Sequence, residues 1–395
     1  MNIMKKRNEC LKQLKSASNL MKRDKDYWVN FLCEIEPLNT AVDEVEKTIR
    51  ILANYDKELK FINEREPIGL YRVSLPFNNP IYSFVLYSCG IALGGNEVIV
   101  RPSKHTASYV VAFYNTYPQF KDLGISLFLG TGNEFISSAY TDKTTSGILF
   151  TGAYDHLKDI IDNIPNAKHL IYCGSGYNPI ILGRGIHSID KAVDVVIESR
   201  IYNSGQDCLC SEKIIVHASI YDEFLKSLSE KLSKLKLGKF GDKSADIYPP
   251  FDAINDEIKK RYADIKRSEK CIFDRTENGC ILSAFEVDIN SQALNSEKFC
   301  PIFTIAKYSD ENDLSPILLS EYKFGIIVLG DVNLNLFNEF PHIVTSGTVM
   351  QTEAMDAHVP FGGRGKSGFS IINNRYKDGP ILFSYETTKN KLEPT

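Results

Sequence analysis

Four apolar runs with the character of buried strands recur at regular intervals along the first half of the chain, and this spacing strongly constrains the fold. The runs lie at 97–100, 125–129, 147–150 and 169–172. Counted from Val98 to Ser126, Ile148 and Leu170, the successive intervals are 28, 22 and 22 residues, and segments with helical character connect the runs at 106–117, after Gly132 and at 154–163. Such strand–helix–strand spacing predicts a parallel, doubly wound sheet that binds a nucleotide at its strand ends.

A second stretch of the same texture follows the first. Its predicted elements are helices at 190–202 and 220–237 and strands at 213–216, 280–285, 302–307 and 325–329. Gly238 is expected to end the second helix, and 239–257 has the composition of an exposed loop. The two stretches together predict an α/β protein with two Rossmann-like, doubly wound domains.

Residues 8–54 differ from the rest of the chain, because apolar side chains recur there at helical intervals among many charges. This pattern indicates two or three amphipathic helices. We expect them to form a packing layer without chemistry of its own.

The composition of the 395-residue chain is that of a globular protein of about two ordinary domains, with 43% hydrophobic residues. A count of 46 basic against 50 acidic residues gives a formal charge of −4, so electrostatics give no reason to expect a nucleic acid or a membrane as partner. No apolar run is long enough to span a bilayer, and the basic N-terminus lacks the apolar segment of a signal peptide. We therefore expect a cytoplasmic protein.

Nine cysteines are scattered along the chain, at positions 10, 33, 89, 173, 208, 210, 271, 280 and 300. An odd, unclustered set is not typical of a disulfide-stabilised domain. The one close pair, Cys208 and Cys210, has no matching pair downstream for zinc. We expect reduced thiols and no metal site.

Three loops at predicted strand ends have residues suited to phosphate groups. They are Arg101-Pro102-Ser103-Lys104, Gly130-Thr131-Gly132-Asn133-Glu134-Phe135 and Phe150-Thr151-Gly152. The second begins like a dinucleotide-binding GxGxxG motif but ends in Phe, so a simple turn is the better interpretation of it alone. Three such loops at successive strand ends of one sheet nevertheless indicate a cofactor site.

A polar turn, NSGQDC at 203–208, presents Cys208 ahead of a strand. A cysteine is usually a small buried apolar residue, but a thiol in such a turn is placed to be reached by a substrate. Upstream, PFNNP at 76–80 is a rigid loop that presents two side-chain amides. Further loop signatures are EKFCP at 297–301 and PFGGRGKSG at 360–368.

Taken in order, these segments resemble the aldehyde dehydrogenase superfamily. PIGLYRVSLPFNNP is similar to its PxG…PWNxP segment, GGNEVIVRPSKHT to GNxVVxKPSExT, and GILFTGA to IxFTGS. NSGQDC resembles the nucleophile motif GQxC, SEKFCPI resembles EExFGPV, and PFGGRGKSGFS resembles PFGGxxxSGxG. The collinear match runs from about residue 66 to 370.

The resemblance implies NAD(P)-dependent oxidation of an aldehyde to a carboxylic acid. Cys208 would form a thiohemiacetal and then a thioester, and the Asn78 amide with the Cys208 N–H would stabilise the oxyanion. The family's cofactor-binding positions correspond here to Pro76, Phe77, Arg101, Ser103, Lys104, Gly132, Phe150, Thr151, Gly152, Glu297 and Phe299. Because Arg101, Ser103 and Lys104 would neutralise a 2′-phosphate, NADP is preferred slightly over NAD.

Three departures from the family pattern concern the catalytic residues. Cys173 stands where oxidising members have the Glu that activates water, and a thiol is a poor general base near neutral pH. Asp207 beside the nucleophile should raise the pKa of the Cys208 thiol. Ala153 replaces the Ser of FTGS, which is a smaller loss.

Two alternative functions follow from the missing Glu. The chain also resembles the CoA-acylating branch of the family, in which CoA resolves the thioester; GSGYNP at 174–179 is loosely similar to its glycine-rich segment. In that alignment Asn79 would replace Asn78 as the amide donor. The other alternative is a family scaffold with little turnover, retained for binding or assembly.

The resemblance also divides the chain. We expect a cofactor domain at 1–172, a catalytic thiol domain at 173–370 and an oligomerisation tail at 371–395, with an arm at 55–65 that joins a homodimer or tetramer. Asn78 lies 130 residues before Cys208, as in the family, so the shortening relative to the family is expected at the N-terminus. The sequence does not identify the aldehyde; Tyr82, Tyr202 and Phe361 are candidate wall residues, with core packing as the alternative for each.

Overall fold

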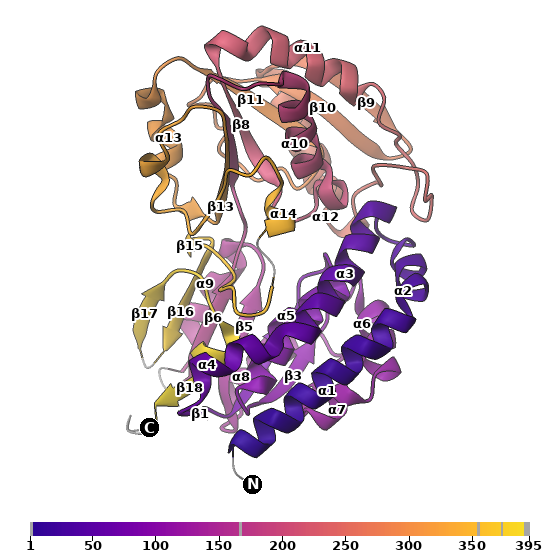
Figure 1. Cartoon of the computed structure of the whole chain (residues 1–395), viewed down its shortest axis with the longest axis vertical. Coiled ribbons are helices and arrows are strands. Elements are labelled where there is room, and N and C mark those ends of the chain that lie inside the picture. The colour runs from indigo at the N-terminus through magenta and orange to yellow at the C-terminus, as the bar shows by residue number, and fades with distance from the viewer. Residues whose placement is uncertain (1–2, 166–167, 354–355, 373, 391–395) are drawn as a thin grey trace.

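The computed structural model describes residues 3–165, 168–353, 356–372 and 374–390, and its strands form two large sheets (Figure 1). The first sheet, in the lower half of Figure 1, contains β2 (Leu70–Ser74), β3 (Glu97–Arg101), β4 (Ile125–Leu127), β5 (Thr145–Thr151), β6 (His169–Cys173), β16 (Gly368–Ile372) and β17 (Arg375–Asp378). The order across it is β17-β16-β6-β5-β2-β3-β4. β2 to β6 pair in parallel, which confirms the predicted α/β class.

Strand β2 was not predicted, although it lies at the centre of this sheet between β3 and β5. Its sequence, LYRVS, is interrupted by Arg72, which hides the apolar pattern. Arg72 is buried, and its guanidinium group binds Asp142 and the Thr145 hydroxyl, so the fold compensates the charge inside the strand.

Three helices of the first half lie where they were predicted: α6 (Ala107–Thr116), α8 (Gly132–Thr141) and α9 (Tyr154–Asn163). A fourth, α5 (Pro80–Leu93), was not predicted. α5 is buried along its whole length, and the N-terminal helices pack beside it (Figure 1). Those are α1 (Ile3–Arg23), α2 (Lys25–Leu32) and α3 (Leu38–Asn54).

The chain returns to the first sheet near its C-terminus. β16 pairs antiparallel with β6, and β17 pairs antiparallel with β16, so the sheet is mixed and not wholly parallel as predicted. Within the predicted tail, the range 380–389 contains the short helix α15 (Phe383–Glu386) and the beginning of β18 (Thr388–Asn390). β18 pairs with β1 (Arg65–Pro67), so the predicted arm and tail meet within one chain. Their role in a dimer or tetramer stays a prediction.

The second sheet occupies the upper half of Figure 1. Its strands are β7 (Asn178–Leu182), β8 (Ser211–His217), β9 (Lys270–Glu277), β10 (Cys280–Glu286), β11 (Ile302–Tyr308), β13 (Gly325–Leu329) and β14 (His342–Val344), in the order β14-β13-β7-β8-β11-β10-β9. β9 is antiparallel to β10, and the other pairs are parallel. The helices α10 (Ile189–Ile201) and α11 (Tyr221–Leu232) lie beside it.

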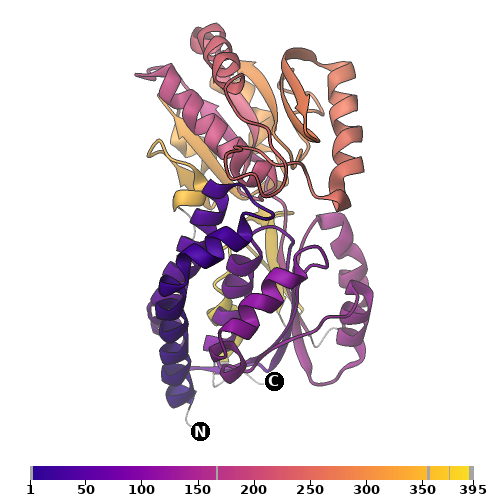
Figure 2. The same cartoon turned by 90° about the vertical axis from the view of Figure 1, so that its right-hand side faces the viewer.

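Two predictions for this half are wrong. α11 ends at Leu232 rather than at 237, because Leu237 forms a bridge with Ile247 and the Gly238 N–H bonds to the Ile247 carbonyl. The predicted loop 239–257 contains the start of α12 (Asp252–Ser268), a highly charged helix with few buried positions. In Figure 2, α12 stands above α9 on the same side of the molecule.

A buried carboxyl group on α3 positions the beginning of α5. Glu44 Oε1 accepts hydrogen bonds from the backbone N–H groups of Ile81 (2.8 Å) and Tyr82 (2.9 Å), which have no partner within the helix. Burial raises the pKa of Glu44 to about 7, and burial together with the Glu44 charge raises the pKa of the neighbouring Glu36 well above its usual value. Glu44 therefore fixes the start of α5, and with it the PFNNP loop, against α3.

No helix within the described ranges combines the length and the apolar character that crossing a membrane requires.

Candidate active site

A cavity of about 440 Å³ lies where the two halves of the chain meet. The ends of β2, β3, β5 and β6 reach it from the first sheet, and the turn that follows α10 reaches it from the second half. Side chains of α3, α5, α12 and the short helix α14 (Met350–Glu353) complete its wall. The cavity therefore lies at the carboxyl ends of the parallel strands, where α/β sheets bind their ligands.

The turn that presents Cys208 has an unusual backbone. Asn203, Ser204 and Gly205 follow one another with φ angles of 46°, 55° and 75°, the left-handed region that favours glycine. A Cβ atom at Gly205 would lie 2.6 Å from the Cys300 carbonyl carbon, so this position requires glycine. Hydrogen bonds hold the turn: Ser204 Oγ accepts from the Tyr248 N–H at 2.8 Å.

Asn178 fixes the other side of the Cys208 residue. Its Nδ2 atom donates to the carbonyl oxygens of Cys208 (2.8 Å) and Cys210 (3.1 Å), while its Oδ1 accepts from the Gly325 N–H. Cys208 itself is half-buried and lines the cavity. The thiol is therefore presented to the cavity by a backbone that is restrained on both sides.

Asp207 is the centre of a hydrogen-bond cluster beside the thiol. Its buried carboxylate accepts from the Leu209 N–H at 2.9 Å and from the side-chain amides of Asn79 at 2.7 Å, Asn78 at 3.3 Å and Gln351 at 3.4 Å. The predicted oxyanion donor, Asn78, thus shares this cavity with Cys208. One carboxylate links the nucleophile turn, the loop before α5, and α14.

The same environment makes the thiol a weak acid. Burial raises the pKa of Cys208 well above its usual value, and the charges of Asp207 and Glu297 raise it further. The predicted effect of Asp207 on the thiol is confirmed. Without a ligand, Cys208 is therefore protonated near neutral pH.

Most of the predicted cofactor residues line this cavity. They are Pro76, Phe77, Arg101, Ser103, Phe150, Thr151, Gly152, Glu297 and Phe299. Lys104 and Gly132 are not among the lining residues: Lys104 is exposed, and Gly132 begins α8 beside the Arg101 guanidinium group. The GTGNEF segment is a helix start, in which Thr131 and Glu134 form a capping box that occupies the α8 N-terminus.

The N-terminus of α9, in contrast, suits a phosphate group. Its N-cap, Ala153, makes no side-chain capping bond, so the first N–H groups of α9 are left without a side-chain acceptor. The preceding Gly152 has a φ of 146° and its carbonyl oxygen is held by the Tyr172 hydroxyl at 3.0 Å. Arg101 and Ser103 lie on the same cavity, so these residues fit a nucleotide cofactor.

Two aromatic side chains and a carboxyl group also line the cavity. Phe77 and Phe299 form an edge-to-face pair with ring centroids 5.8 Å apart. Glu297 accepts a hydrogen bond from Ser175 Oγ at 3.0 Å, and burial together with the Glu212 charge raises the pKa of Glu297 to about 8. These three side chains share the cavity with Cys208.

A buried carboxylate holds the backbone of this second loop. Glu212 accepts from the N–H groups of Lys298 (2.9 Å) and Phe299 (3.3 Å), and from Arg200 Nη1 at 2.9 Å. Phe299 has a left-handed φ of 54°, which such bonds help to maintain.

Cys173 lies at the end of β6 and lines the cavity, where the sequence alignment expects a base. Its thiol is buried, and burial raises its pKa well above the usual value. At the position where the resemblance predicts a carboxylate, the chain therefore has a thiol that stays protonated.

Several cavity residues were missed by the sequence analysis. Glu44 and Lys47 of α3 line the cavity, so the prediction that residues 8–54 carry no chemistry is not supported there. Glu257 and Arg261 of α12 line it as well, and they were missed because no helix was predicted at 252–268. The sequence of α3 did contain an indication of their role: Glu44 and Lys47 are charged residues among the apolar positions Ala41, Val45 and Ile49.

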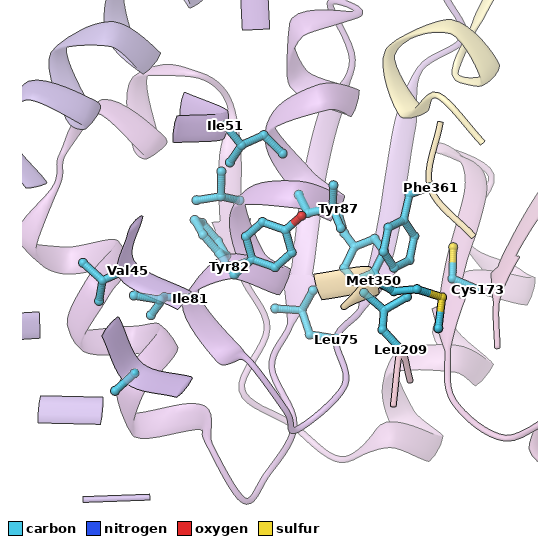
Figure 3. Packing of buried hydrophobic residues seen from close by; sticks show 14 of the residues in the cluster. Val45, Ile51, Leu75, Ile81, Tyr82, Tyr87, Cys173, Leu209, Met350 and Phe361 are labelled. Carbon is cyan, nitrogen blue, oxygen red and sulfur yellow. The ribbon is translucent and has the colours of Figure 1, made fainter. Parts of the chain in front are cut away.

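The three predicted wall residues, Tyr82, Tyr202 and Phe361, all line the cavity. In Figure 3, Phe361 lies beside Tyr87, and their ring centroids are 5.7 Å apart. Among the described residues, no group of three or more His, Cys, Asp or Glu side chains is arranged to hold a metal ion.

Removing the charge of Asp207 should make Cys208 more acidic. In an Asp207→Asn variant we expect the Cys208 pKa to fall, so that alkylation by iodoacetamide below that pKa becomes about tenfold faster. The exposed Cys271 on β9 is an internal control, whose alkylation in the same sample should be unchanged. An unchanged or slower alkylation of Cys208, quantified by peptide mass spectrometry across pH, would contradict the assigned electrostatics.

Comparison with known proteins accounts for this arrangement. A lactaldehyde dehydrogenase of Methanococcus vannielii is 27% identical over 372 residues, which cover 86% of this chain and 78% of that protein. A D-glyceraldehyde dehydrogenase (NADP(+)) of Picrophilus torridus is 27% identical over 283 residues, covering 65% and 56%. The glyceraldehyde-3-phosphate dehydrogenase GapN of Methanocaldococcus jannaschii, solved with NADP, has the same fold, with a TM-score of 0.84 and 21% identity over 97% of this chain and 88% of that one. The model of the aldehyde dehydrogenase family matches residues 2–382, and this chain belongs to that family.

Proposed function

We propose that this chain oxidises an aldehyde to a carboxylic acid, with NADP or NAD as hydride acceptor and Cys208 as nucleophile. The observation that carries the proposal is the meeting of the Cys208 thiol and the Asn78 amide on one cavity, which continues to the uncapped N-terminus of α9. The names of the two relatives, a lactaldehyde and a glyceraldehyde dehydrogenase, support the same reaction class.

The chain's own groups would act as follows. Cys208 releases its proton to solvent, and its sulfur bonds to the aldehyde carbon while the carbonyl π bond opens to an oxyanion, which gives a thiohemiacetal. The Asn78 amide and the Cys208 N–H would donate hydrogen bonds to the new oxyanion. Before substrate binds, the Asn78 amide makes only a long hydrogen bond to Asp207, at 3.3 Å, so it can also bind the oxyanion. When bound, the nicotinamide cofactor supplies the hydride acceptor. The thioester left on Cys208 is then released as the acid by water.

The cofactor would be held by residues of the first sheet. The N–H groups at the start of α9, next to Thr151 and Gly152, suit the pyrophosphate. Arg101 and Ser103 would bind a 2′-phosphate, which favours NADP. Two predicted residues lie outside the cavity wall: Lys104 would add positive charge nearby, and Gly132 packs closely beside Arg101. Pro76, Phe77, Glu297 and Phe299 would surround the nicotinamide ribose and ring.

Turnover with a panel of aldehydes tests the proposal, with the absorbance of the reduced cofactor as the readout. We expect NAD(P)H formation without CoA, a higher kcat/KM with NADP than with NAD, and a loss of about 1,000-fold or more in Cys208→Ser. Cys210→Ser, two residues away, is the matched control and should keep the activity, because that buried thiol faces the Tyr202 carbonyl. Retained activity in Cys208→Ser would show that another group is the nucleophile.

The buried, protonated Cys173 favours a second candidate, a CoA-acylating aldehyde dehydrogenase or acyl-CoA reductase. Without a carboxylate at this position, water activation is weak and a thiol such as CoA would resolve the thioester instead. CoA-dependent turnover in the aldehyde panel would support this candidate over hydrolysis.

Restoring the base provides the sharper test. In Cys173→Glu we expect release of acid without CoA to rise about tenfold or more, because the carboxylate can take a proton from water. Cys173→Ser, which removes the thiol without adding a base, should show no such gain. Equal rates in the two variants would mean that deacylation does not depend on this position.

A further inference from the structure

The part of the cavity between α5, α14 and the nucleophile turn has polar groups without a partner. We call it the α5 chamber and define it by Asn79, Tyr82, Leu209 and Gln351, all of which line the cavity. Among the described residues, Asn79 Oδ1, the Tyr82 hydroxyl and Gln351 Oε1 have no hydrogen-bond partner, although all three atoms are buried. Their residues are only 8%, 7% and 2% exposed. A buried polar atom without a partner is unfavourable, so three in one place point to a ligand.

Asp207 determines which ends of the two amides are free. The Nδ2 atom of Asn79 and the Nε2 atom of Gln351 both donate to its carboxylate. Both amide oxygens are therefore turned away from Asp207 and are available as acceptors. The Tyr82 hydroxyl adds a group that can donate or accept, and Figure 3 shows it directed from the Tyr82 ring toward Tyr87.

Most charged groups around the chamber already have partners. Asp207 accepts from four donors, and Glu44 Oε1 binds the two N–H groups at the start of α5. Lys47 is paired with Asp43, which also accepts from the Tyr202 hydroxyl at 2.6 Å. Glu44 Oε2 has no hydrogen-bond partner among the described residues, but burial raises the pKa of this carboxyl group to about 7, so it does not carry a full negative charge near neutral pH. A substrate with an ammonium or a carboxylate group would thus enter a buried site without a full opposite charge to pair with.

Hydroxyl groups fit this arrangement better than an apolar or a charged tail. A hydroxyl can donate to an amide oxygen and accept from Tyr82, whereas an alkyl tail would leave all three atoms unpaired. Leu209 and Tyr87 supply apolar wall for the carbon chain. We propose that the α5 chamber selects short aldehydes with hydroxyl groups on the carbons next to the carbonyl, bound by Asn79, Tyr82 and Gln351. This inference rests on the proposed aldehyde oxidation and names its substrate class.

A substrate series measures the selection. We expect kcat/KM to rise about tenfold for each hydroxyl from propanal to 2-hydroxypropanal and 2,3-dihydroxypropanal, because each relieves a buried, unpaired group. The charged aldehydes for comparison are 3-aminopropanal and 4-oxobutanoate, and both should have a lower kcat/KM than 2-hydroxypropanal. A preference for propanal, or for either charged aldehyde, would overturn the inference.

Tyr82→Phe removes one of the three polar atoms without changing the size of the ring. We expect it to lower kcat/KM for 2-hydroxypropanal about tenfold relative to propanal, with no loss of thermal stability, because its hydroxyl has no partner within the described residues. Tyr114→Phe is the matched control: that tyrosine is similarly buried, but its hydroxyl donates to the Ile125 carbonyl, far from the cavity wall. Tyr114→Phe should leave the ratio unchanged. An unchanged ratio in Tyr82→Phe would contradict the assignment.

A second readout separates this inference from the proposed reaction. Each aldehyde is tested without cofactor for its ability to protect Cys208 from alkylation by iodoacetamide. Better protection by the hydroxylated aldehydes without any turnover would support the chamber and reject the oxidation. Turnover with equal kcat/KM along the series would support the oxidation and reject the chamber.

Discussion

The buried carboxylate of Asp207 is the interaction on which the site depends. It accepts hydrogen bonds from the nucleophile turn, the loop before α5, and α14, three segments that are far apart in the sequence. Burying a carboxylate is costly unless several donors surround it, and burial does raise the pKa of Asp207 while the Leu209 N–H and the Asn79 amide lower it. The same charge raises the pKa of Cys208, so the group that assembles the site also keeps its nucleophile protonated.

Two other buried carboxyl groups perform a comparable structural task. Glu44 binds two backbone N–H groups at the start of α5, and Glu212 binds two in the loop that carries Glu297 and Phe299. In each case a side chain from a neighbouring element fixes a loop that contributes to the cavity wall. Charge-assisted bonds of this kind are stronger than neutral ones, so they can hold a backbone with left-handed residues such as Phe299 in place. The site is positioned by carboxyl groups that do not themselves need to react.

Much of the fold could be predicted from the sequence, because strand and helix spacing reflects local periodicity. The helix at 154–163 and the strand at 325–329 were predicted with their observed bounds. The inner strand β2 was not predicted, because Arg72 interrupts its apolar pattern. The partners that allow the Arg72 charge to be buried lie about 70 positions away in the sequence. Helix α12 was not predicted, because it buries few residues and a highly charged stretch has the composition of a loop.

In the site, too, residues in local motifs could be predicted, and residues whose role depends on distant partners could not. Cys208 and Asn78 could be found from motif and turn chemistry, since each lies in a short polar segment beside a strand or helix. The roles of Glu44, Gln351 and Tyr82 could not, because partners distant in the sequence determine which of their atoms are bonded and which are free. Lys104 shows the opposite error: the loop that carries it was identified, but its side chain points outside the cavity wall.

The central claim is that an acyl group is carried by Cys208, and peptide mass spectrometry tests it directly. The protein is mixed with 2-hydroxypropanal and NADP, quenched in acid during turnover and digested. Our account predicts the mass of the acyl group on the peptide that contains Cys208 and Cys210, with fragmentation placing it on Cys208, and no acyl group when NADP is omitted. Two results would contradict it: an acyl group on Cys210 or Cys173, or product formation in a sample in which no cysteine carries an acyl group.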